Sequence, residues 1–201
     1  MPAAPETILL TLRLTRSLSA ARGRELRAAQ AAARQQWREL AETGAAPDVL
    51  AAAQQRAENQ FFIQFDLALS QSTVGPAWLA EYEKMAETLA GEILLLEESG
   101  FVVPAFAILP RHAHVLVRRP APNRLSLPKA LELLQLRAAQ HCRRLVRPRL
   151  PPEADFWHPG AHEYVVPDEA GLPRLLAYIR ESSRRGGLPA RFEEWPYVKE
   201  E

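Results

Sequence analysis

The chain has 201 residues, of which 47% are hydrophobic, and this is enough to bury one sizeable core. No repeat or low-complexity tract argues for a second domain, so we expect a single domain over residues 1–201. The lone cysteine, Cys142, excludes an internal disulfide and fits a reducing compartment. No signal peptide is recognisable, and the longest strongly apolar stretch, residues 93–96, is far too short to span a bilayer. We therefore expect a soluble, cytoplasmic protein with no membrane partner.

The net charge of +1 conceals a strong asymmetry along the chain. Between Arg111 and Arg149, ten basic residues stand against one acid, Glu132, whereas seven acids stand against one lysine between Asp66 and Glu98. A local surplus of about nine positive charges is the footprint expected for a polyphosphate partner such as a nucleic acid. A solvated helix face is the alternative that charge alone leaves open.

The first predicted element is a strand over Thr7 to Leu14, where apolar and polar residues alternate and Thr11 and Arg13 mark a wetter face. Two helices follow it. The first has apolar residues at helical spacing and ends at Gly44, and the second is opened by Pro47. We interpret these helices as a hairpin inserted over about residues 19–75.

The spacing of apolar residues from Leu79 to Leu96 predicts one long acidic helix that stops before Gly100. An apolar run over Phe101 to Leu109 and a second over His112 to Arg118 then predict two strands. They are joined at Pro110-Arg111 in a hairpin over residues 101–119.

His112 and His114 lie two residues apart on the second of these strands. Because side chains alternate faces along an extended chain, the two imidazoles project together and can hold one ion, while Ala113 faces the other way. The pattern suits a paired-imidazole metal site. Two polar groups on the wet face of a sheet are the plainer interpretation.

An amphipathic helix over Leu125 to Val146, a strand over Ala161 to Val166 and a final helix within residues 171–185 complete the chain. The resulting order predicts an α+β fold. It is a ferredoxin-like βαββαβ antiparallel sheet with a helical hairpin inserted after the first strand and a C-terminal helix that carries Tyr178.

At about 100° per residue, Tyr178 lies roughly 110° from the centre of the apolar stripe of this last helix. It shares that face with four polar residues: Arg174, Glu181, Ser182 and Arg185. The two arginines could lower the cost of a phenolate and bind a phosphate, whereas a packing role needs neither. A half-buried surface tyrosine is the alternative.

Taken together, these motifs resemble the REP-associated tyrosine transposases, which belong to the wider single-tyrosine HUH family. The family has an apolar strand running into Pro-x-His-x-His, an amphipathic helix, a Trp-containing loop, a strand, and a helix with a Tyr-Ile pair. The counterparts here are residues 102–114 (VVPAFAILPRHAH), 156–159 (FWHP), 178–179 (YI), 187–188 (GL) and 195–197 (WPY), with further likeness at 7–18 and 60–66 (QFFIQFD). The resemblance covers essentially the whole chain.

The resemblance implies cleavage and rejoining of single-stranded DNA at hairpin-forming sequences. His112 and His114 would hold a divalent cation, Mg²⁺ or Mn²⁺, and Tyr178 would attack the phosphorus to give a 5′-phosphotyrosine and a free 3′-OH. The DNA would be bound by basic residues, for which the candidates are Arg111, Arg118, Arg119, Arg137, Arg143, Arg144, Arg147, Arg174 and Arg185.

Two departures from the family pattern affect the metal site. Arg111 precedes the first histidine, where the family usually has an amide or an acid. Ser182-Ser183 replaces the family's Asn-Pro, so the Asn oxygen that would be the third metal ligand is absent. The candidates for a replacement ligand are Ser182, Glu181, Glu163 and His162.

Three functions therefore remain open from the sequence. The first is a transposase-like DNA strand transferase that uses Tyr178. The second is a domesticated protein, weak or inactive in catalysis, that binds structured nucleic acid without cutting it. The third is a hydrolytic phosphodiesterase that uses the histidine pair. The sequence leaves open whether the protein is a monomer or a homodimer.

Overall fold

The computed structural model describes residues 6–119, 125–146, 149–151, 153–166, 169–185 and 197–198. The chain forms two compact units, one of Met1–Ser17 with Gly75–Glu201 and the other of Leu18–Val74. Each unit has a hydrophobic cluster of its own. The first unit is a mixed α/β structure built on an antiparallel sheet, and the second is a pair of helices.

The sheet of the first unit has the strand order β4-β1-β3-β2-β5, and every neighbouring pair is antiparallel. Its members are β1 (Glu6–Arg13), β2 (Val102–Ile108), β3 (His112–Arg119), β4 (His162–Val165) and the two-residue β5 (Tyr197–Val198). The central strands β1 and β3 pair along their whole length, from Glu6 opposite Arg119 to Arg13 opposite His112. The hairpin predicted over residues 101–119 is therefore present as β2 and β3.

Helices α4 (Glu83–Leu94) and α5 (Leu127–Val146) cover one face of this sheet. The face presents one alternating set from each central strand, such as Leu10 of β1 and Val115 of β3, and both are fully buried. Leu89 of α4 and Leu134 of α5, also fully buried, belong to the same hydrophobic cluster. Burial of this apolar area is the main force that holds the layer in place.

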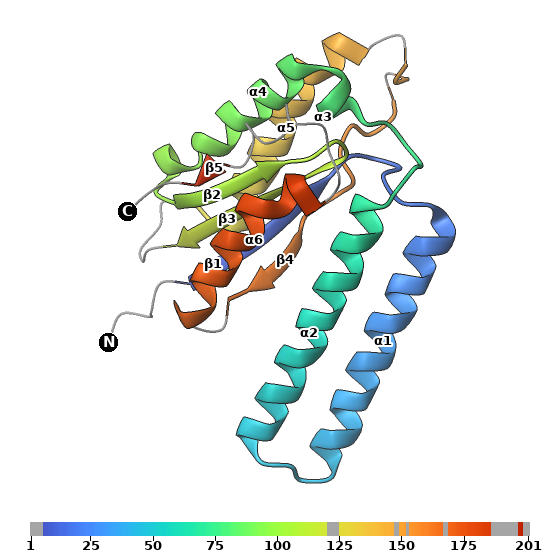
Figure 1. The fold of residues 1–201 in the computed structure, drawn as a ribbon, viewed down its shortest axis with the longest axis vertical. Coiled ribbons are helices and arrows are strands. Elements are labelled where there is room, and N and C mark those ends of the chain that lie inside the picture. The colour runs from blue at the N-terminus through green and yellow to red at the C-terminus, as the bar shows by residue number, and fades with distance from the viewer. Residues whose placement is uncertain are drawn as a thin grey trace. The chain divides into compact units, whose positions relative to one another are not determined.

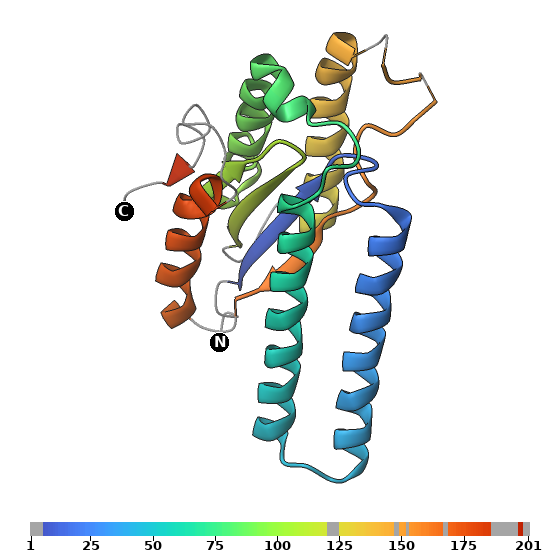
Figure 2. The same ribbon diagram turned by 45° about the vertical axis from the view of Figure 1, so that its right-hand side comes forward.

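Helix α6 (Leu172–Arg185) lies against the opposite face of the sheet, as Figures 1 and 2 show. The strands present Leu9, Thr11, His112, His114 and Leu116 on that side, and each is at most 2% exposed. The expectation of a wetter face on the first strand is thus wrong at Thr11. A polar side chain can be buried there because it has a hydrogen-bonding partner, which is described below.

The long helix predicted over residues 79–96 is interrupted at Tyr82. A short helix α3 (Trp78–Glu81) precedes α4, and a 3-10 turn η1 (Glu97–Ser99) follows it. Tyr82 has an extended backbone, with φ −126° and ψ 96°. The apolar spacing continues through the break because Trp78, Leu79 and Met85 are all buried in one core, and spacing alone therefore hides the interruption.

The second unit consists of α1 (Ala20–Glu42) and α2 (Pro47–Ser70), which run side by side as a hairpin (Figure 2). Ser19 caps α1 by accepting a hydrogen bond from the backbone N–H of Arg22, and Pro47 stands in the first turn of α2. A small cluster that includes Leu26, Phe65 and Leu69 forms its core.

Within the described residues, no helix combines the length and the apolar character needed to cross a bilayer.

Candidate functional site

Three strands place polar side chains in one row on the face that α6 covers. Thr11 of β1 is opposite His114 of β3 on one side and opposite His162 of β4 on the other. Because directly opposite residues of an antiparallel pair project to the same face, these three side chains are neighbours. Ala107 of β2, on the far side of His114, has too small a side chain to cover the imidazole from that strand.

His114 is the central member of the row. Its Nδ1 lies 3.1 Å from Thr11 Oγ1, and both residues are almost completely buried. When the Nδ1 proton faces the threonine oxygen, the Nε2 lone pair is left for a cation. This is the usual arrangement of a metal-binding histidine, in which the second ring nitrogen is held by a polar neighbour.

His112 stands beside His114 on the same face of β3. Their ring centroids are 4.9 Å apart, the ring planes meet at 77°, and His112 is only 2% exposed. Two imidazoles so close and so shielded from water form a nitrogen-rich pair, as the alternation of residues 112–114 predicts.

Tyr178 reaches this pair from α6. The centroid of its ring is 5.7 Å from that of His114, at an interplanar angle of 64°, and the residue is half-buried. The next residue, Ile179, is completely buried and fixes this turn of the helix. His114 and Tyr178, 64 positions apart in sequence, are thus adjacent in space.

His162 contributes a further imidazole at the edge of the cluster. Burial and, to a smaller extent, the neighbouring His114 lower the pKa of His162 to about 4. The ring is therefore neutral at pH 7 and keeps a lone pair for a ligand or a proton.

The other candidates for the third ligand lie less favourably. Glu163 is exposed on the opposite face of β4, since the strand alternates, and Glu181 is exposed on α6. Ser182 is 9% exposed and faces inward, but its hydroxyl donates a hydrogen bond of 2.7 Å to the carbonyl of Ile179. Of the four candidates, His162 is the one whose pKa is lowered by a member of the histidine pair, His114.

The donor set fits a divalent cation in kind. Buried neutral imidazoles are ligands for first-row divalent ions, and Thr11 orients one of them.

The structure does not bring the basic helix to this site. Helix α5 packs on the other face of the sheet, so Arg137, Arg143 and Arg144 lie on the side away from His112 and His114. Two of them already have partners in the fold. Arg137 Nε is 2.8 Å from Glu92 Oε2, and an Arg143 guanidinium nitrogen donates to the carbonyl of Ala154.

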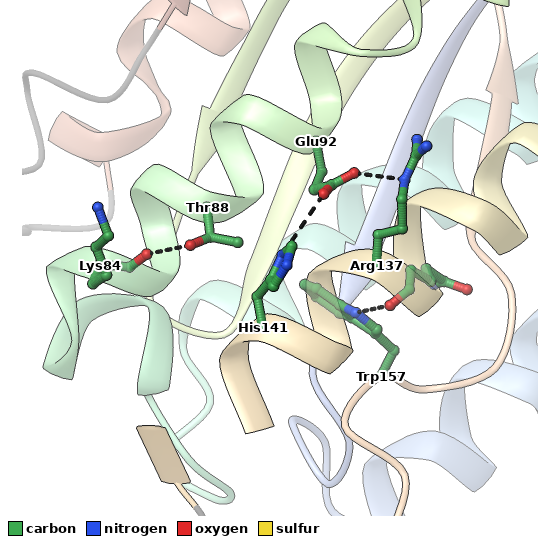
Figure 3. A network of polar contacts seen from close by, with 7 residues as sticks. Lys84, Thr88, Glu92, Arg137, His141 and Trp157 are labelled. Atoms are coloured by element: carbon green, nitrogen blue, oxygen red, sulfur yellow. Dashed lines mark hydrogen bonds and ion pairs between the residues drawn. The ribbon is translucent and has the colours of Figure 1, made fainter. Parts of the chain in front are cut away.

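Figure 3 shows that Glu92 of α4 points toward α5, where Arg137 and His141 face it. The Glu92 side chain is only 8% exposed, and His141 Nδ1 is 3.9 Å from its Oε1. Arg137 therefore neutralises a buried carboxylate between two helices, which is a structural use of this charge.

The remaining predicted arginines are spread over the fold. Arg118 shares the face of His112 and His114 at the far end of β3, and Arg119 forms an ion pair of 3.2 Å with Glu6. Arg111 is half-buried next to His112, and Arg174 is exposed on α6. Arg147 and the motif positions 187–188 and 195–196 lie outside the described residues, as do the side chains of Ser183 and Arg185.

Thr11 is the site residue that the sequence analysis assigned no role. The sequence does contain a signal that places Thr11 near the histidines. With the first and third strands paired antiparallel at the centre of the sheet, a threonine on the polar face of the first strand must lie close to the histidines. The exact register was needed to place it opposite His114.

No protein family profile matches the chain, and no curated protein matches it. Among solved structures, the chain is similar to a REP-associated tyrosine transposase bound to a REP hairpin. The TM-score is 0.50 at 10% sequence identity, and the match covers 98% of this chain and 78% of the other. At this identity the likeness establishes the fold.

Proposed function

We propose that this protein cleaves and rejoins single-stranded DNA at hairpin-forming sequences, with Tyr178 as the nucleophile. The observation that carries the proposal is the convergence of His112, His114 and Tyr178. The ring centroids of the two histidines are 4.9 Å apart, and those of His114 and Tyr178 are 5.7 Å apart. The fold likeness to a transposase that was solved with a DNA hairpin supports it.

The proposal includes a ferredoxin-like topology for the fold. The strand order β4-β1-β3-β2, with α4 and α5 on one face, supports a ferredoxin-like core that β5 and α6 extend. In this core the histidines stand at the start of the central strand β3, and Tyr178 of α6 packs against His114.

Tyr178 would attack the phosphorus through its phenolic oxygen. The new bond joins that oxygen to phosphorus, the bond to the leaving 3′ oxygen breaks, and the products are a 5′-phosphotyrosine and a free 3′-OH. Because one phosphodiester replaces another, the reverse attack by a 3′-OH reseals the strand without ATP.

His112 and His114 would hold the divalent cation, with His162 as the proposed third ligand. A cation there would stabilise negative charge on the non-bridging phosphate oxygens. Thr11 would keep the Nε2 of His114 turned toward the cation through its contact with Nδ1.

The test is a covalent-adduct assay with labelled, hairpin-flanked DNA oligonucleotides and Mn²⁺ or Mg²⁺. Wild type should form an adduct that resists denaturation, Tyr178→Phe should form none, and EDTA should abolish the reaction. Tyr82→Phe, at the α3–α4 junction, is the matched control and should react like wild type. The proposal fails if no Tyr178-dependent adduct appears over a broad set of hairpins.

A second candidate function is binding of structured nucleic acid without cleavage. The Ser182 hydroxyl favours it, because this group donates to the Ile179 carbonyl and stands where the family has a metal-binding amide. Arg111 beside the histidines adds a charge that opposes a cation. This candidate predicts hairpin binding that is unchanged by Tyr178→Phe and by EDTA, and it is excluded by formation of the adduct.

A further inference from the structure

One face of helix α1 carries an exposed row of four arginines. Arg24, Arg27, Arg34 and Arg38 are all exposed, and we call them the arginine stripe. At about 100° per residue they fall within an arc of about 80°, and at about 1.5 Å per residue they span about 21 Å. The stripe points well away from the side of α1 on which the buried Leu26 lies.

Acidic residues near the stripe do not neutralise it. Within the described residues, neither a hydrogen bond nor an ion pair is recorded for any of the four arginines. Of the acids on α1, Glu25 pairs with Arg22 at 2.8 Å and Glu39 accepts a hydrogen bond from Gln35. Glu42, four residues after Arg38 on the same face, forms no ion pair with it in the described structure. The stripe is thus a line of free positive charge.

The spacing of the stripe works against the helix that carries it. Arg24 and Arg27 are three residues apart, and Arg34 and Arg38 are four apart, so each pair places like charges on adjacent turns. An ordinary solvated helix face mixes signs at this spacing. Charges that destabilise their own helix and lack internal partners are most simply explained by an external anion.

We propose that the arginine stripe binds the phosphate backbone of the base-paired stem of a DNA hairpin. This inference rests on the nucleic-acid partner of the proposed function, and it names the surface that holds that partner. A row of guanidinium groups that extends over about 21 Å of helix can contact several phosphates along a duplex. Surfaces for single strands combine positive charge with aromatic platforms, whereas Trp37, the aromatic residue of α1, is turned about 100° from the centre of the stripe.

Two features of α1 leave room for a backbone to approach. Ala31 lies between the two arginine pairs on the same face, and its side chain is short and exposed. Gly23 borders the stripe at its first turn, and a Cβ there would lie 3.5 Å from the Arg27 guanidinium. Glycine is unfavourable inside a helix, so its presence here is consistent with close contact to a partner.

The test measures binding of a labelled DNA hairpin with a stem of about 12 base pairs to the full chain over a range of salt concentrations. The stripe variant is Arg27→Gln/Arg34→Gln/Arg38→Gln, because glutamine keeps the helix propensity and removes the charge. The control is Arg22→Gln/Arg56→Gln/Lys84→Gln, which loses the same three charges away from the stripe. Circular dichroism verifies that both variants are folded.

The stripe variant should bind the hairpin at least about tenfold more weakly at physiological salt, and its slope of log K against log salt should fall by about 2 to 3. The control should stay within about twofold of wild type. Equal binding by the stripe variant and wild type, or an equal loss in the control, overturns the proposal.

Further arms of the same experiment separate other occupants. With an unpaired strand of equal length, the stripe variant should lose less binding than with the hairpin. Tight stripe-dependent binding of an RNA hairpin in preference to the DNA hairpin would overturn the choice of DNA. Competition by polyglutamate as strong as by DNA would assign the stripe to an acidic protein. Stripe-dependent binding without any Tyr178 adduct refutes strand transfer alone. An adduct formed with unchanged binding by the stripe variant refutes the stripe alone.

Discussion

At the scale of single residues, the candidate site depends on one buried threonine. The sequence predicts the shared face of His112 and His114 from alternation, and it predicts from helical periodicity that Tyr178 lies off the apolar stripe of its helix. It does not predict that their surroundings are dry, although Thr11 and His114 are almost completely buried and Tyr178 of α6 packs against His114. The local sequence pattern around these residues does not show that a helix from a distant segment packs over them.

Replacement of Thr11 by valine should weaken metal binding without opening a cavity. Valine has nearly the same shape, but it cannot hydrogen-bond to His114 Nδ1, so the imidazole loses its orientation. Loss of such a supporting partner typically lowers metal affinity by about 10- to 100-fold. Titration of Mn²⁺ by isothermal calorimetry measures the change, and Thr7→Val on the same strand is the control. Equal affinity in Thr11→Val and wild type would show that the contact does not support the metal.

Cys142 should be unreactive in the folded protein. Burial and then the Glu92 carboxylate raise the pKa of its thiol to about 12, well above its ordinary value. A raised pKa keeps the proton on sulfur, so at pH 8 the nucleophilic thiolate is roughly a thousandfold rarer than in the unfolded chain. Iodoacetamide labelling followed by mass spectrometry should be negligible from pH 7 to 9 and become fast in concentrated urea. Rapid labelling of the folded chain at pH 8 would contradict the burial of this side chain.

At the scale of elements, the sequence predicts the strands and most helices, but it does not predict which face of the sheet each helix covers. The periodicity of residues 125–146 indicates a helix with a basic side, and nothing in it says that this side lies across the sheet from the histidines. The break at Tyr82 was missed for a related reason. Both α3 and α4 bury apolar residues in one core, and the apolar spacing runs through the junction without a glycine or a proline.

The contact between α4 and α5 should depend on Arg137. Its removal by Arg137→Met would leave the Glu92 carboxylate, 8% exposed, without its closest cation. Leaving a buried charge without the partner of its ion pair costs about 1–3 kcal/mol. Urea unfolding measures this change, and Arg144→Met, exposed on the same helix, should change stability by at most about 0.5 kcal/mol. If Glu92→Leu/Arg137→Met regains most of the loss, the buried charge is the cause. Equal stability of Arg137→Met and wild type would show that the pair is not a structural contact.

At the scale of the whole molecule, the chain consists of two units that the sequence predicted as one domain with an insertion. Ser17 and Gly75 end the two segments of the first unit on either side of the inserted helices. These ends are close, because a Cβ on Gly75, whose φ is +72°, would overlap the carbonyl oxygen of Arg16. The helices therefore leave and re-enter the first unit at nearly one point, and the apolar clusters of the two units share no residue.

Deletion of residues 18–74, with Ser17 joined to Gly75 by a short glycine-serine linker, should leave the first unit folded. Its sheet and the layer of α4 and α5 draw all of their buried cluster from residues outside the deletion, and the linker has only a short gap to close. Cooperative urea unfolding and a native circular dichroism spectrum are the expected results. A linker variant with Gly75→Ala should be less stable than its parent, because the new Cβ would overlap the Arg16 carbonyl in a left-handed backbone conformation. If the shortened chain is instead molten, with no cooperative transition, the first unit depends on the inserted helices, and the two cores form one folding unit.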